Sequence, residues 1–74
     1  MAPLRFRGRN YFIANADENG IRRVHEGASF IGDFVERDGY VCEVRPTREN
    51  ETELFVELAK TAELAGMFKV NLQA

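Results

Sequence analysis

The chain lacks the residues with which most small proteins cross-link themselves. Its 74 residues include one cysteine and one histidine. One cysteine cannot close an internal disulfide, and one cysteine with one histidine cannot complete a tetrahedral zinc site without carboxylate ligands. We therefore expect no metal and no cofactor. We also expect a small core that stabilises the fold by only ~3–5 kcal/mol, so that further stability must come from close packing or from self-association.

Long hydrophobic runs and phosphate-binding glycine patterns are also missing. No apolar run approaches the roughly 18 residues that a membrane-spanning helix needs, and no P-loop or dinucleotide-binding pattern occurs. The N-terminal residues MAPLRFRGR contain no apolar segment of a secretory signal, and a lone thiol is typical of a reducing compartment. These absences predict a cytoplasmic protein with no membrane partner.

Positive charge is scarce outside the N-terminus. Arg5, Arg7 and Arg9 give the first nine residues a charge of +3, so the total of −2 leaves −5 for residues 10–74. The acidic residues gather late, at Glu49, Glu51, Glu53, Glu57 and Glu63. An acidic body is a poor electrostatic match for duplex nucleic acid, which makes nucleic acid the less favoured partner.

Enough apolar residues are present to fold the chain. An apolar fraction of 45% with six phenylalanines favours a globule over a disordered chain. The length predicts a single small α+β domain over residues 10–74. Residues 1–9 form either a basic arm or the first part of the first strand.

Two turn signals predict antiparallel strands. Asn19-Gly20 is typical of a two-residue hairpin turn, and its register places Tyr11, Ile13 and Val24 on one face of the sheet. Phe12 then lies on the opposite face. In the long segment that follows, Gly27 is interpreted as a bulge.

Asp38-Gly39 predicts a second hairpin, in which the apolar residues separate more cleanly between the two faces than they do in the first. Uninterrupted pairing from this turn places Val35, Cys42 and Val44 on one face, and Phe34 with Val41 on the other. A cysteine at such a position is most often a small buried hydrophobe. Pro46 ends the strand because it cannot donate to a ladder.

The segment after Pro46 predicts a helix. Thr47 and Asn50 are alternative N-caps, apolar residues recur at helical spacing from Leu54 to Ala65, and Gly66 suits the position after the last turn. The expected fold is a three-stranded antiparallel β-meander followed by one amphipathic α-helix on one sheet face. Residues 67–72 form either a short fourth strand or a tail packed on the helix.

This arrangement leaves one sheet face without a cover, and that face motivates the main functional hypothesis. We expect a small acidic protein-binding module, acting as a regulator, inhibitor or accessory subunit and not as an enzyme. Its contact residues are either the uncovered face, with Phe12, Phe34 and Val41, or the acidic helix face, with Glu53, Glu57 and Lys60. A homodimer is an open alternative, because a meander has two free edges.

Nucleic-acid binding is the alternative function. Arg5, Arg7 and Arg9 are interleaved with Phe6, Tyr11 and Phe12, which is typical of single-stranded nucleic-acid surfaces. The same arginines could instead contact an acidic protein or the chain's own acidic helix, or form a solvated arm. For His25 and Cys42 we expect structural roles and no catalysis, since each lies within a predicted strand.

Overall fold

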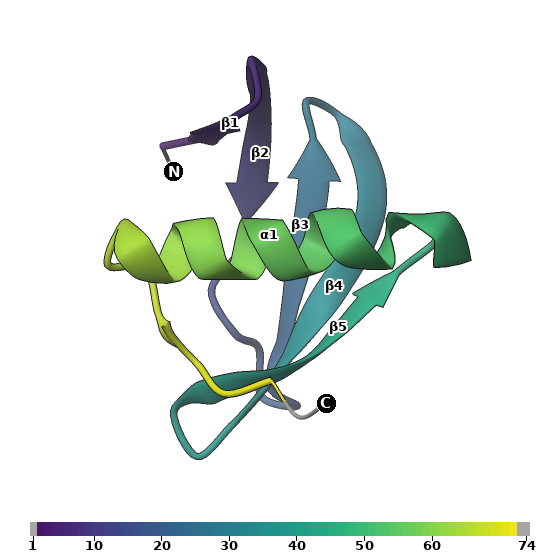
Figure 1. The fold of residues 1–74 in the computed structure, drawn as a ribbon. Helices are drawn as coiled ribbons and strands as arrows, with labels where there is room; N and C mark the ends of the chain where they lie inside the picture. Colours follow the sequence, from purple (N-terminus) through teal and green to yellow (C-terminus); the bar gives the residue numbers. More distant parts are fainter. Residues whose placement is uncertain (1, 73–74) are drawn as a thin grey trace.

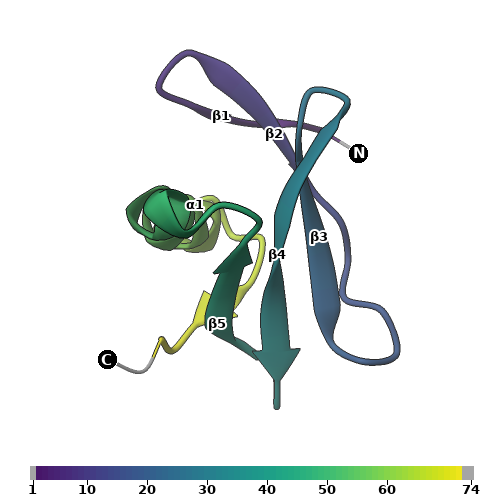
Figure 2. The ribbon, with the colours of Figure 1, turned by 90° about the vertical axis from the view of Figure 1, so that its right-hand side faces the viewer.

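In the computed structural model, which describes residues 2–72, a curled sheet wraps around one helix (Figures 1 and 2). Its strands pair in chain order, antiparallel throughout except for β5 with β6, which are parallel. A short 3₁₀ turn, η1 (Glu49–Glu51), precedes the helix α1 (Thr52–Leu64). The strands are β1 (Leu4–Phe6), β2 (Arg9–Ile13), β3 (Ile21–Glu26), β4 (Ser29–Arg37), β5 (Tyr40–Pro46) and β6 (Lys69–Val70).

The class is α+β, but the predicted three-stranded meander is wrong because the sheet has six strands within residues 2–72. Two tight turns account for most of the difference. Arg7 and Gly8 both have positive φ, 49° and 76°, as a two-residue hairpin turn requires, so the N-terminal residues fold back as β1 on β2. The chain turns again between Glu26 and Ser29, where the sequence suggested only a bulge, and this turn separates β3 from β4.

The loop before β3 shifts the first predicted register by two residues. Val24 pairs with Ile13, whereas a two-residue turn at Asn19-Gly20 would pair it with Asn15. The Asp17 carboxylate causes this shift, because its Oδ1 accepts hydrogen bonds from the backbone N–H groups of Asn19 and Ile21 and so holds a wider turn. A shift of two keeps every side chain on its face, so Tyr11, Ile13 and Val24 share a face, as predicted, and all are buried.

A bulge in β5 alters the second predicted hairpin. Glu36 pairs with Val41 and Val35 pairs with Glu43, so Cys42 has no residue opposite it. The extra residue moves Val44 to the face of Phe34, with which it pairs, whereas uninterrupted pairing had placed them on opposite faces.

The helix fills the concave side of the sheet. Phe34 on β4 meets Phe55 on α1 edge to face, with ring centroids 5.6 Å apart. A side chain at Gly32 would lie 2.7 Å from the Phe55 ring, so glycine permits this close approach. The buried core comprises Leu4, Tyr11, Ile13, Val24, Phe34, Val41, Phe55, Leu58, Ala59 and Ala62.

The end of α1 determines where β6 lies. Gly66 has a φ of 80° and its N–H donates to the Glu63 carbonyl, while the Met67 N–H donates to the Ala62 carbonyl. These two bonds form a Schellman motif, which confirms Gly66 as the residue that ends the helix. The reversal returns the chain alongside β5, where Phe68 packs against Phe34.

Candidate functional site

The structure places the three predicted contact residues on different sides of the sheet. Phe34 and Val41 are fully buried beneath α1. The prediction that they lie on the uncovered face is therefore wrong, and they belong to the core. Phe12 is half-buried and does lie on the face away from the helix, because it is adjacent in β2 to the buried Tyr11 and Ile13.

The helix-free face carries a row of three rings. Phe12 on β2 is opposite His25 on β3, and His25 is opposite Phe30 on β4. Residues directly opposite in an antiparallel ladder share a face. The His25 and Phe30 rings meet edge to face with centroids 5.5 Å apart, and Phe30 is 48% exposed. We call Phe12, His25 and Phe30 the ring row.

Ion pairs border the ring row on the same face. Arg45 Nε lies 2.7 Å from Asp33 Oδ1, and Arg23 Nη1 lies 3.4 Å from Asp17 Oδ2. The hydrogen bond to Asp33 raises the pKa of Arg45. Each of these two arginines thus has a carboxylate of its own, and the surroundings of the row are close to neutral.

The three N-terminal arginines do not form one surface. Arg5 pairs with Asn10 and Arg9 pairs with Phe6, so the turn places Arg5 and Arg9 on opposite faces of the hairpin. Arg5 donates to Asn10 Oδ1 at 3.0 Å, and Arg9 contacts Glu26 at 2.8 Å. Arg7, at the turn, lies 4.9 Å above the Phe6 ring centroid. The alternation of Arg5, Arg7 and Arg9 would place all three on one face of a continuous strand, but the turn at Arg7 interrupts the strand.

The residues predicted to form the acidic helix face, Glu53, Glu57 and Lys60, are exposed along the outer side of α1. Glu53 and Glu57 also border a groove of about 450 Å³ between α1 and the tip of the β1–β2 hairpin, and Arg7 forms its other wall. The structure thus brings one of the predicted nucleic-acid contacts beside two of the predicted protein contacts. The sequence signal for this arrangement is Gly8 after Arg7, and it is a weak signal because the turn also requires a positive φ at Arg7.

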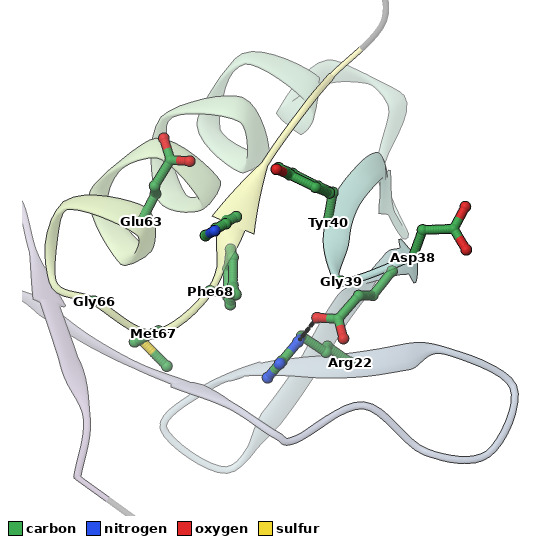
Figure 3. Close-up of a pocket in the computed structure, with 10 residues that line it drawn as sticks. Arg22, Asp38, Gly39, Tyr40, Glu63, Gly66, Met67 and Phe68 are labelled. Atoms are coloured by element: carbon green, nitrogen blue, oxygen red, sulfur yellow. Dashed lines mark hydrogen bonds and ion pairs between the residues drawn. The ribbon is translucent and has the colours of Figure 1, made fainter.

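A second depression, of about 560 Å³, opens between the C-terminal end of α1, β6 and the β4–β5 turn (Figure 3). Arg22 lies at its base, 2.7 Å from Glu36, and it also donates to the Ala14 carbonyl and lies 5.0 Å from the Phe68 ring centroid. Glu63, on the rim, accepts the Val70 N–H. Both groups already bind the protein itself, and the other polar side chains that line the depression are Asp38, Tyr40 and Lys69.

The two residues with catalytic potential lie apart from these hollows. His25 belongs to the ring row, and the Cys42 thiol lies 3.5 Å from the Val35 carbonyl oxygen, toward which it donates. Residues 2–72 contain no cluster of three or more histidine, cysteine or carboxylate side chains able to hold a metal. Within the same range, no helix is long and apolar enough to cross a membrane.

The comparisons with known proteins leave the site to be interpreted from its own geometry. No family model, no curated protein and no solved structure matches this chain.

Proposed function

We propose that this chain is a non-enzymatic protein-binding module, a regulator or accessory subunit that docks through the helix-free face of its sheet. The observation that carries the proposal is the ring row, which crosses three adjacent strands on the face away from α1. Figure 2 shows that α1 lies on one side of β3 and β4 and leaves their other side open. Exposed aromatic rings offer a large apolar area with few rotatable bonds, and phenylalanine is enriched in the buried centres of protein interfaces.

The charges around the row favour a protein partner over nucleic acid. A phosphate backbone needs free cations, whereas Arg23 and Arg45 are each paired with a carboxylate. Residues 2–46 contain equal numbers of basic and acidic residues, so the net charge of −2 comes from residues 47–72. A neutral aromatic centre with paired charges at its rim suits a protein that offers an apolar side chain surrounded by polar groups.

Site-specific photocrosslinking tests the proposal. The crosslinker p-benzoylphenylalanine replaces Phe30 in one protein and Leu64 in another, because Leu64 is 89% exposed on the helix and serves as the matched control. Each protein is irradiated in nuclease-treated lysate of the source cells, and the adducts are mapped by mass spectrometry. We expect the Phe30 probe to crosslink one defined protein surface, and the Leu64 probe not to.

Competition makes the result specific. Excess wild-type chain should abolish the adduct, while excess Phe30→Ala chain, confirmed as folded by circular dichroism, should compete about tenfold less well. The proposal fails if both probes give the same adducts, if neither gives one, or if Phe30→Ala competes as well as the wild type. Adducts to nucleic acid at position 30 in untreated lysate would instead identify the ring row as a base-stacking surface.

A further inference from the structure

We propose that the groove between the β1–β2 hairpin tip and α1 is a second binding surface, which takes an extended peptide carrying a basic side chain next to an apolar one. It lies on the helix side of the molecule, away from the ring row, and so goes beyond the proposed function. The groove is lined by Arg7, Thr52, Glu53, Leu54, Val56 and Glu57.

The apolar part of the groove comes from the helix. Leu54 packs partly against the core, and Val56 is also only half-buried. Each leaves part of its side chain to the groove, where an apolar group from a ligand can remove more of that surface from water.

The charges of the groove select the ligand's chemistry. Glu53 and Glu57 are one helical turn apart and exposed, and neither belongs to an ion pair within residues 2–72. Two such carboxylates attract one basic side chain and repel phosphate. On the other wall, the Arg7 guanidinium can donate to a backbone carbonyl or a carboxylate of the same ligand.

The size of the groove matches a short extended segment. Residues 52–57 cover about 8 Å of helix at 1.5 Å per residue, which is the length of two or three residues of a β-strand. Leu54 and Val56 lie on either side of the two glutamates around the helix, so a segment in the groove can place a basic group between the glutamates and an apolar group on one of these two residues.

Chemical-shift mapping tests this inference. The ¹⁵N-labelled chain is titrated with a short capped peptide that alternates valine with lysine, and separately with one that alternates valine with glutamate. We expect the lysine peptide to shift the amides of residues 52–57 and of Arg7, and the glutamate peptide to leave them unchanged. Glu53→Gln with Glu57→Gln should weaken the lysine peptide about fivefold.

The control variant is Glu43→Gln, which makes the same chemical change at an exposed position on β5 outside the groove, and it should leave the affinity unchanged. The inference is overturned if the lysine peptide shifts no amides or shifts amides other than those of residues 52–57 and Arg7. It is also overturned if the glutamate peptide causes the same shifts, or if Glu43→Gln weakens binding as much as the double glutamate variant does. Phe30→Ala should not affect this titration, so failure of the groove and failure of the ring row are distinguishable.

Discussion

Phe34 and Phe30 lie on the same strand, yet one is fully buried beneath the helix and the other is 48% exposed on the opposite face. The two residues are four positions apart, so an uninterrupted strand would place both side chains on the same face. Between them, Val24 pairs with Gly32 while His25 pairs with Phe30, so Ile31 is an extra residue in β4. A single bulge therefore determines which phenylalanine belongs to the core and which belongs to the ring row.

The largest expected effect comes from truncating these two rings. Phe34→Ala should lower the free energy of unfolding by about 3–5 kcal/mol, because it leaves a cavity against Phe55 and Phe68. Phe30→Ala should cost less than about 1 kcal/mol, since half of its surface is already in water. Urea denaturation followed by circular dichroism measures both.

If Phe34→Ala does not fold, Phe34→Leu gives a measurable intermediate loss. Equal losses at positions 30 and 34 would show that the two faces do not differ in burial as described.

Glycine substitutions should give the next largest effect. Gly32 has a φ of 146°, and a Cβ there would lie 2.7 Å from both the Phe55 ring and Pro46 Cα. Gly32→Ala should therefore destabilise the fold by more than about 1 kcal/mol, through backbone strain and displacement of α1. Gly27→Ala meets no atom within 4 Å, so its φ of 58° is its only source of strain. A loss at Gly27 equal to that at Gly32 would contradict the close helix contact.

The sequence supports the class, the helix and its glycine end, but not the strand count. Leu54, Leu58 and Ala62 recur at helical spacing, and Gly66 ends the helix as predicted. The hairpin turn at Arg7-Gly8 is harder to foresee, because a non-glycine residue with positive φ is uncommon. The turn brings Leu4 into the core, a tertiary contact that the local sequence does not reveal.

The ring row was only partly accessible to sequence reasoning. Alternation correctly separates Phe12 from Tyr11 and Ile13, because no bulge interrupts β2. It fails at Phe34 and Val44, since bulges arise from pairing between strands and leave no mark on the periodicity of one strand. Each bulge moves every side chain beyond it to the opposite face of the sheet from the one that simple alternation predicts.

The two faces also allow one kind of ion pair to be compared in two settings. Arg22–Glu36 on the helix side and Arg45–Asp33 on the helix-free side both have an N–O distance of 2.7 Å. The Arg22 side chain is 13% exposed and that of Arg45 is 48% exposed. Glu36→Gln should cost about 1–2 kcal/mol, because it leaves a largely buried guanidinium without its charge partner.

The Asp33 side chain is itself 16% exposed, but Asp33→Asn leaves the half-exposed Arg45 guanidinium in contact with water, so it should cost less, below about 1 kcal/mol. Urea denaturation of the two variants, with double-mutant cycles using Arg22→Met and Arg45→Met, measures the coupling in each pair. A stronger coupling on the helix-free face would mean that burial does not govern these pairs.

The smallest effect concerns pH and the loop that fixes the register of β3. Hydrogen bonds from the Ile21 and Asn19 backbone N–H groups lower the pKa of Asp17 from its usual 3.8. A carboxyl whose pKa is lower in the folded state stabilises the fold above its unfolded pKa, and this stabilisation is lost as pH falls through the folded value. The urea concentration at which half of the wild-type protein is unfolded should therefore decrease as the pH drops below about 4. The midpoint of Asp17→Asn should fall less, because its amide oxygen accepts the same bonds without titrating. If the two midpoints change in parallel with pH, Asp17 does not couple protonation to this loop.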